Sequence, residues 1–323
     1  MAMPMPTTDS VVGMNIRDNV LRITEAASSG GEWRITKLAQ ARLSTPWGFS
    51  MFKERQAARR LAEDIDRLLE TSEVRAAQAV FTLDSNMVFI KKIPVDPNLS
   101  GGRLREQVNW EVEQYVISVP NDFVVDFEHQ PVVDGQPHAN AVVVFVRKTI
   151  VDFLKDMFVE TRLRLKAIDV DVFAAHRLLT AGTAAGTPGR TALVDVRKEN
   201  LQFSIAHGKD FFLSQEIDYP VEEEGDLRRR EEDHLARVIS KELRRILLDH
   251  KLGRGIEELS GLILYGEGVS AAVIDALRAM HNIRIELANP FRRLKVTGPI
   301  GDAAIQSHPE SFVLSVGAAI KAL

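Results

Sequence analysis

The stretch "TALVDVRKENLQFSI", residues 191–205, predicts a β-hairpin. Its first apolar run ends at Asp195-Val196, a polar turn follows, and a second alternation of apolar and polar residues begins at Leu201. Hairpins of this outline hold nucleotide phosphates in many proteins. They carry an acid at the end of the first strand and, two residues later, a glycine that lets backbone N–H groups approach the phosphate. Here Arg197 takes the place of that glycine, so the outline favours a phosphate site and the residue argues against one.

An earlier turn has the same outline. Asn15-Ile16-Arg17 lies 180 positions before Asp195-Val196-Arg197, and each segment closes one predicted strand and precedes another. Both halves of the chain then alternate predicted strands and helices, which is typical of α/β domains. A duplicated architecture explains this pattern better than chance. We expect two similar lobes that face each other across a cleft lined by the two turns.

Composition limits the class of protein. The 323 residues are 45% hydrophobic and 27% charged, which is ordinary for a globular chain of about two domains. The net charge of -4 gives no general attraction to nucleic acid. The absence of cysteine excludes disulfides, thiolate metal sites and cysteine nucleophiles. No apolar run reaches the length of a membrane span, so we expect a soluble cytoplasmic protein with a flexible tail at 1–10.

Hydrophobic periodicity predicts the order of the elements. The predicted strands cover 11–25 with a turn at 17–19, 34–43, 79–83, 87–93, 123–133, 139–146, 165–170, 192–196, 201–206, 211–217, 262–265 and 283–287. The predicted helices cover 57–70, 103–116, 150–161, 173–179, a long segment around 235–247, 270–280 and 310–323. The segment "GTAAGTPG", 182–189, is the best linker candidate because it is rich in glycine and small residues.

Several segments, taken together, resemble one protein family. The most specific is 105–115, "REQVNWEVEQY", followed by Asp126. The other matching segments follow in the same order as in the family, at 144–148, 168–174, 192–195, 262–268, 289–291 and 316–319. From about Val11 to the C-terminus the chain resembles the PilM-like type IV pilus assembly proteins, which belong to the actin-like ATPase superfamily with FtsA and the cytoplasmic domain of GspL.

The resemblance implies an α/β, actin-like (ribonuclease H-like) duplicated two-lobe fold with a small inserted subdomain. The expected division is a first lobe at 11–82 and 148–188, an insert at 83–147, and a second lobe at 189–323 whose last helix, 310–323, packs at the interlobe region. It also implies a place at the inner face of the bacterial inner membrane. There the family binds the short N-terminal cytoplasmic peptide of PilN, a single-span membrane protein.

The first hairpin departs from the nucleotide-binding pattern of actin-like proteins, "G-x-D-x-G-S-S-x-x-K". The chain keeps Gly13, but Asn15 has lost the charge of the acid that organises Mg²⁺. Arg17 replaces the second glycine, and Arg22 keeps the positive charge of the lysine. A side chain at a glycine that needs positive φ costs about 1–2 kcal/mol or rearranges the turn.

The other two nucleotide-binding elements are also altered. The second hairpin keeps the acid, Asp195, but Arg197 fills its turn. The third element should read "G-G-G" and reads Gly266-Glu267-Gly268, so it brings a carboxylate toward an anionic ligand. We expect both arginines to be solvated. The alternatives are that they grip phosphate or that one of them pairs with Glu267 and holds an empty site closed.

Other candidate chemistry is sparse. The eight histidines show no spacing typical of metal ligands, so no metal site is expected. Asp169 and Asp171 end a predicted strand, and we weigh a contribution to the cleft against capping of the next helix. Trp110 lies on an amphipathic helix, and we interpret it as a core residue.

The leading hypothesis is a non-enzymatic scaffold that binds a PilN-like N-terminal peptide. We place the peptide groove between the first lobe and the insert, with Phe89, Ile90, Ile93, Val142 and Val144 as candidate contacts. No cofactor is expected, with ATP and Mg²⁺ as the alternative, and the pilus motor ATPase is a further candidate partner. The alternatives are an ATP-binding switch or weak ATPase of the same complex and an FtsA-like filament former. The last is disfavoured because "VGAAIKAL" is typical of a packed helix without a membrane anchor behind it. The oligomeric state stays open.

Overall fold

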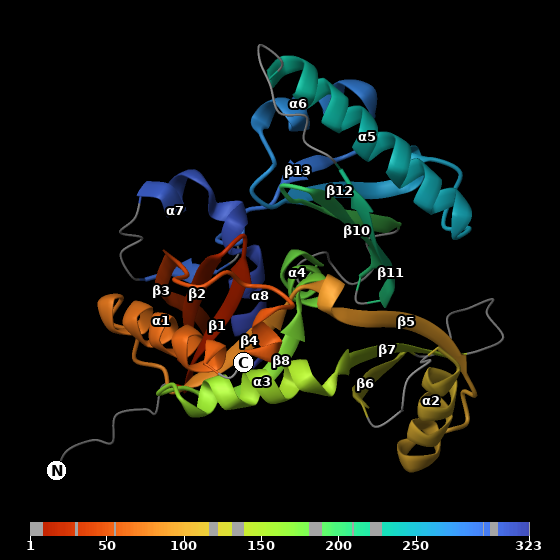
Figure 1. Ribbon diagram of the computed structural model, residues 1–323. Coiled ribbons are helices and arrows are strands. Elements are labelled where there is room, and N and C mark those ends of the chain that lie inside the picture. Colours follow the sequence, from red (N-terminus) through yellow and green to blue (C-terminus); the bar gives the residue numbers. More distant parts are fainter. Residues whose placement is uncertain are drawn as a thin grey trace. The chain divides into compact units, whose positions relative to one another are not determined.

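Figure 1 shows the computed structural model, in which two compact units are distinguished. The first unit comprises 1–171, 297–299 and 318–323, and the second comprises 172–296 and 300–317. The structure describes residues 9–29, 32–54, 56–115, 122–130, 139–180, 189–208, 210–219, 228–292, 294–297 and 303–322. Most of the predicted linker and nearly all of the predicted tail lie outside these residues. Helix α4 (Asp171–Thr180), which the sequence analysis assigned to the first lobe, falls almost wholly in the second unit.

The first unit is built on a mixed sheet. Its strands lie in the order β3-β2-β1-β4-β8, with β1 to β3 antiparallel and β4 and β8 parallel to β1. Their bounds are β1 Asp9–Arg17, β2 Val20–Ser29, β3 Glu32–Arg42, β4 Gln78–Leu83 and β8 Arg164–Val170. The predicted break in the first β segment is therefore confirmed. It falls at Asp18-Asn19, between two strands that the sequence marked by alternation.

Helices cover both faces of this sheet. Successive strand residues point to opposite faces, so neighbours on β4 meet different helices. Phe81 lies 6.2 Å, ring to ring, from Phe158 of α3 (Lys148–Val159), whereas Val80 packs with Ala318 and Ala319 near the end of α8 (Val313–Lys321). The remaining helices of the unit are α1 Ala57–Thr71, which packs beside α3, and the short η1 Met51–Lys53 and η2 Ser85–Met87.

An inserted three-stranded sheet belongs to the first unit. Its antiparallel order is β5-β7-β6, and α2 covers one face. The bounds are β5 Val88–Val95, α2 Gly101–Tyr115, β6 Phe123–Gln130 and β7 Ala139–Arg147. Leu104, Val108 and Val112 form the predicted buried face of α2. Trp110 is 59% exposed, so its interpretation as a core residue is wrong: two residues before Val112, it lies about 200° around the helix.

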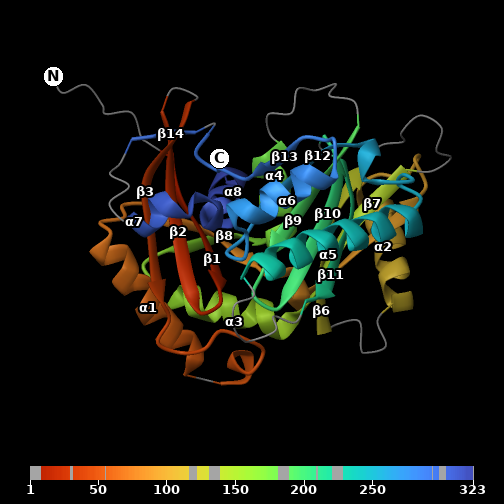
Figure 2. The same cartoon turned by 90° about the horizontal axis from the view of Figure 1, so that it is seen from above.

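The second unit is a sheet covered by two long helices. Its strands lie in the order β11-β10-β9-β12-β13, and Figure 2 shows α5 and α6 side by side over it. The bounds are β9 Arg190–Val196, β10 Asn200–His207, β11 Asp210–Asp218, α5 Arg228–Asp249, η4 Ile256–Glu258, β12 Leu259–Tyr265, α6 Ala271–Met280, β13 Ile285–Leu287, β14 Lys295–Val296, α7 Ala303–Ser307 and η5 Pro309–Phe312. In the described part of the chain, no helix is long and apolar enough to cross a membrane.

Candidate functional site

The first hairpin closes through two residues in the left-handed region. Asp18 has a φ of 50° and Asn19 a φ of 62°, which matches the type I′ geometry that suits the twist of a two-residue hairpin. The Asn19 carbonyl accepts a hydrogen bond from Leu43 N at 2.8 Å, and its side-chain Oδ1 accepts one from Trp47 N at 2.7 Å. Of the two outcomes expected for Arg17, a strained backbone or a rearranged turn, the strain is absent because the positive φ values fall on the next two residues.

Arg17 is buried in an ion-pair cluster rather than solvated. Only 8% of the residue is exposed. Its Nη2 lies 3.2 Å from Asp84 Oδ1 and 3.3 Å from Asp171 Oδ2. Asp84 follows β4 and Asp171 follows β8, and both strands run parallel to β1. Because the carboxyl ends of parallel strands meet at one edge of a sheet, the three side chains converge there, and the prediction of a solvated Arg17 is wrong.

Other predicted residues of the first hairpin lie on the same sheet. Asn15 and Arg22 are cross-strand partners, and both are buried. Arg22 has its pKa lowered to about 10, first because burial removes water from the guanidinium and second because Arg17 adds a like charge; Asp18 opposes the shift. Gly13 lies inside β1 rather than at a turn. Asp169, weighed in the sequence analysis with Asp171, accepts a bond from Lys321 Nζ at 2.9 Å.

The second hairpin buries its arginine with different partners. Arg197 is 9% exposed, so the prediction that it is solvated is also wrong. Its Nε donates to Asp195 Oδ2 at 3.1 Å, and its Nη1 lies 3.2 Å from Glu216 Oε2 on β11. Asp195 is fully buried, whereas the Glu216 side chain is 30% exposed. The acid that the second hairpin keeps from the nucleotide-binding pattern therefore forms an ion pair with an arginine two residues away.

The glycine turn packs directly against the end of β9. Gly266 has a φ of 96°, and a Cβ there would lie 2.5 Å from Val196 O and against Asp195. Gly268 N donates to Val196 O at 3.1 Å, and a Cβ on Gly268 would lie 2.7 Å from Val196 Cγ1. Both positions require glycine because the backbone of this turn and the backbone at the end of β9 approach each other closely. Glu267 between them is exposed.

The donor set does not fit Mg²⁺ and a nucleotide phosphate. Mg²⁺ requires oxygen ligands, and the carboxylates at both hairpins lie within 3.3 Å of a guanidinium nitrogen. Bound Mg²⁺ would have to displace a buried arginine and leave that charge without its partners, which is costly. Among the described residues there is no group of three metal-ligating side chains. We therefore derive no chemical step through ATP.

The predicted peptide contacts divide between two faces of the inserted sheet. Ile93 is 2% exposed and lies in the core beneath α2. Phe89, on that same face, is 48% exposed and stacks on Phe145 at a centroid distance of 4.9 Å. Ile90 and Val144 are partly exposed cross-strand partners on the opposite face, and the third residue predicted there, Val142, is buried.

Sequence reasoning missed two groups of residues. Asp84 and Glu216 supply carboxylates to the buried arginines but were not singled out. Asp84 directly follows a predicted strand, and that position was an available signal, whereas nothing local marks Glu216 within β11. The exposed apolar residues of the insert, Trp110, Tyr115 and Val124, were also missed as surface residues. Trp110 and Val124 lie off the buried face of their helix or strand, whereas Tyr115 lies on the face that helical spacing predicts to be buried and is exposed as the last residue of α2.

Comparison with known proteins identifies the family. The model of the type IV pilus assembly protein PilM family matches residues 13–219. A solved structure described as a "PilM-PilN type IV pilus biogenesis complex" is similar, with a TM-score of 0.74 and 21% identity over 96% of this chain and 98% of that one. A Bacteroides thetaiotaomicron protein with an actin-like ATPase fold and unknown function has a TM-score of 0.50 and 10% identity over 90% of this chain and 95% of its own. The fold is thus actin-like, and because the family model matches well over half of its residues, the chain belongs to the PilM family of type IV pilus assembly proteins.

Proposed function

We propose that this protein is a non-enzymatic adaptor at the cytoplasmic face of the inner membrane. It binds the N-terminal cytoplasmic peptide of a PilN-like membrane protein and does not hydrolyse ATP. Family membership supports the role in pilus assembly. The similar solved structure is of a complex with PilN, which supports the choice of partner.

The burial of Arg17 and Arg197 carries the non-enzymatic part of the proposal. Each guanidinium lies where the resemblance places a phosphate-binding turn, and each is bound by carboxylates of its own unit. A phosphate would have to compete with those carboxylates for the arginine. ATP would also lose the glycine backbone that normally approaches it. We therefore expect neither tight nucleotide binding nor turnover.

Partly exposed apolar residues of the insert supply the peptide surface in this proposal. Ile90, Val144 and Val124 lie on the face of the β5-β7-β6 sheet opposite α2, and Val124 is 41% exposed. Edge strands β5 and β6 border this face, so an extended peptide has main-chain groups to pair with as well as apolar side chains to cover.

Calorimetry tests the two parts separately. One titration uses a synthetic peptide with the N-terminal sequence of the PilN-like protein from the same organism, and the other uses ATP with Mg²⁺. We expect saturable peptide binding and no measurable heat from ATP. A low-micromolar dissociation constant for ATP would overturn the non-enzymatic part, and absence of peptide binding would overturn the adaptor.

A pair of variants tests the peptide surface. Ile90→Asp places a charge on the face opposite α2 and should weaken peptide binding at least tenfold. Met280→Asp is the matched control because Met280 is an exposed apolar residue of the second unit. Equal affinities of the two variants would exclude this surface. Circular dichroism of each variant establishes that it is folded.

A further inference from the structure

Strand β8 forms an open edge of the first unit's main sheet. Among the described residues it pairs with β4 and with no other strand, so main-chain groups along its outer side face away from the sheet. Open edges are templates for a further strand, either from an aggregation partner or from a specific peptide. What borders this edge decides which kind of strand it accepts.

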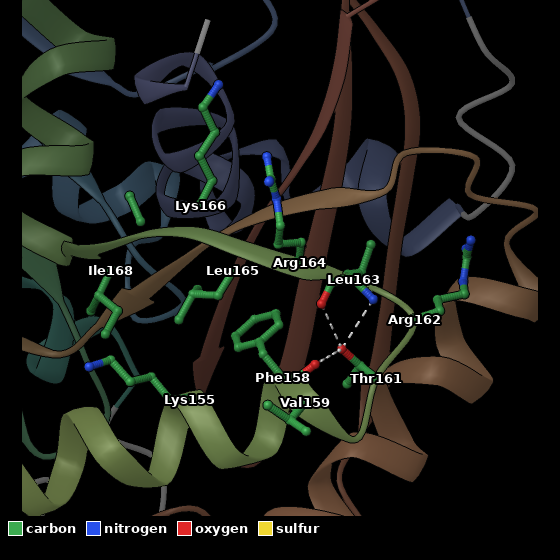
Figure 3. A pocket seen from close by; sticks show the side chains of 11 residues that line it. Lys155, Phe158, Val159, Thr161, Arg162, Leu163, Arg164, Leu165, Lys166 and Ile168 are labelled. Atoms are coloured by element: carbon green, nitrogen blue, oxygen red, sulfur yellow. Dashed lines mark hydrogen bonds between the residues drawn. The ribbon is translucent and has the colours of Figure 1, made fainter.

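An apolar groove of about 680 Å³ runs between β8 and the C-terminal half of α3. Figure 3 shows Leu165 of the strand and Phe158 of the helix lining it. Leu163 and Ile168 also line the groove. At the rim, Val159 is 82% exposed, the highest value among the exposed large apolar residues of the described chain. The groove thus offers apolar surface along one side of the open edge.

Positive charge surrounds the same edge. Of the eleven lining residues, four are basic and none is acidic: Lys155, Arg162, Arg164 and Lys166. Figure 3 shows Arg164 and Lys166 on the side of β8 that points away from α3. Lys166 Nζ donates to the Ala322 carbonyl at 2.7 Å, a bond that orients the ammonium group without neutralising its charge. The side of the edge away from α3 is therefore basic, and the side facing α3 is mainly apolar with Lys155 on the helix.

We propose that the β8 edge is a docking surface for an extended partner segment in which acidic and apolar residues alternate. Side chains of an added strand point alternately to the two faces of the sheet. In this arrangement its apolar side chains enter the groove beside α3. Its carboxylates lie next to Arg164 and Lys166, at the distance of cross-strand pairs.

The surface is separate from the hairpin ion pairs. Arg17 and Val11 lie on the same face of β1, and Val11 packs with Ala318 of α8. The groove lies on the α3 face of the sheet instead, and Arg164 and Lys166, although they point away from α3, lie near the start of β8, at the opposite end of the strand from Asp171. A ligand at β8 would therefore contact a different part of the molecule from any ligand near Arg17.

Edge protection is the competing explanation. Lysine, arginine and β-bulges are common devices against strand addition, and β8 has a register shift between Leu165 and Ala167 as well as its basic residues. An edge that is only protected does not require an apolar groove, however, and the exposed Val159 beside it would favour unwanted association. Basic side chains that repel a basic or purely apolar strand also select an acidic one.

A synthetic peptide tests the proposal directly. The probe is fluorescein-labelled EVEIEVE, with KVKIKVK as the control of reversed charge and a scrambled peptide of the same composition, VIVEEEE. We expect the anisotropy of EVEIEVE alone to rise saturably on titration with the full chain, and hydrogen exchange to slow at 164–168. Affinity should fall as salt rises, because exposed charges are screened. Two versions of EVEIEVE methylated at the Glu or at the Val and Ile nitrogens separate strand addition from simple charge attraction, since only one set of N–H groups can face β8.

Variants complete the test. Arg164→Glu should weaken binding of EVEIEVE at least fivefold, and Arg59→Glu is the control because Arg59 is an exposed arginine of the same unit outside the groove. Four results would overturn the proposal: no binding, equal binding of the scrambled peptide, equal loss from both arginine variants, or no effect of either methylated set. Self-association of the chain that Arg164→Glu abolishes, without peptide binding, would overturn it in favour of a second copy as the occupant.

Discussion

The two hairpins differ in how they bury an arginine where the resemblance expects glycine. Arg17 is the last residue of β1, and its carboxylates come from the ends of β4 and β8, 67 and 154 residues away. Arg197 follows β9, and its carboxylates lie 2 and 19 residues away, on its own strand and on β11. The first hairpin takes its positive φ values in the turn itself, whereas near the second hairpin the positive φ lies in Gly266 of the neighbouring turn.

Both hairpins have an arginine where the resemblance expects glycine, but the carboxylates that pair with that arginine come from different parts of each unit. A buried guanidinium requires carboxylates, and each unit supplies them from whichever strands end nearby. The ion pairs of Arg17 connect the ends of three neighbouring strands, β1, β4 and β8. The ion pairs of Arg197 connect the end of β9 to β11. Breaking the two arginines should therefore have different consequences.

The largest expected effect is on stability. Arg17→Met removes a cation from the buried carboxylate of Asp171 and should lower the free energy of unfolding by about 3–5 kcal/mol. Arg197→Met also removes a cation from a fully buried carboxylate, Asp195, so it should cost only a little less, about 3 kcal/mol, because Glu216 is more exposed than Asp84. All three tryptophans, Trp33, Trp47 and Trp110, lie in the first unit, so their fluorescence in urea follows its unfolding. Hydrogen exchange of β9 and β10 follows the second unit.

An exposed pair is the matched control for this comparison. The Arg59 side chain is 74% exposed and lies 3.3 Å from Glu63, whose side chain is 57% exposed, so Arg59→Met should cost less than about 1 kcal/mol. Adding Asp171→Asn to Arg17→Met should restore part of the loss, because the amide carries no buried charge. A cost of Arg17→Met no larger than that of Arg59→Met would contradict the assignment of Arg17 as a buried ion-pair centre.

The second effect concerns the close packing of the Gly266 turn against the end of β9, a contact that only the second hairpin has. Gly266→Ala places a Cβ within 2.5 Å of Val196 O and should cost about 1–3 kcal/mol, read as faster hydrogen exchange of β9 and β12. Gly208→Ala is the control: Gly208 has a φ of 57° with nothing within 4 Å of its Cβ, so it carries the backbone cost alone, about 1 kcal/mol. Equal costs would mean that the close approach to Val196 relaxes freely.

The sequence predicted the local parts of this comparison and missed the distant ones. Alternation and polar turn residues located β1, β2, β9 and β10 to within a few residues, because those signals are local. The burial of Arg17 depends on Asp84 and Asp171, which only the parallel order of β1, β4 and β8 brings near it. No spacing in the sequence encodes that order. The prediction for Trp110 was wrong for another reason: its place on an amphipathic helix was interpreted as burial, although helical periodicity puts it off the face formed by Leu104, Val108 and Val112.

A smaller effect distinguishes the two turns. Asp18→Gly relieves a side chain at a φ of 50° and should raise the stability of the first unit by about 0.5 kcal/mol. Asp18→Asn is the control for the lost charge. Lys198→Gly should instead destabilise by about 0.5 kcal/mol, since its φ is not positive and glycine only adds freedom to the unfolded chain. If urea titrations showed that both variants change the free energy of unfolding in the same direction, the two hairpins would not differ in this way.

The smallest effect is a pH dependence confined to the first hairpin. Arg22 has a pKa of about 10 in the folded chain, below its ordinary value, so the unfolded chain binds this proton more tightly. The free-energy penalty for burying the charged guanidinium is therefore complete below about pH 10. Stability contributed by Arg22 should therefore rise as the pH rises through 10. Relative to Arg22→Met, the natural chain should gain about 0.4 kcal/mol between pH 9 and pH 10, measured by urea unfolding, with lysine and tyrosine titrations cancelling in the difference. A relative loss over this range would mean that partners of Arg22 stabilise its charge more than burial and Arg17 oppose it.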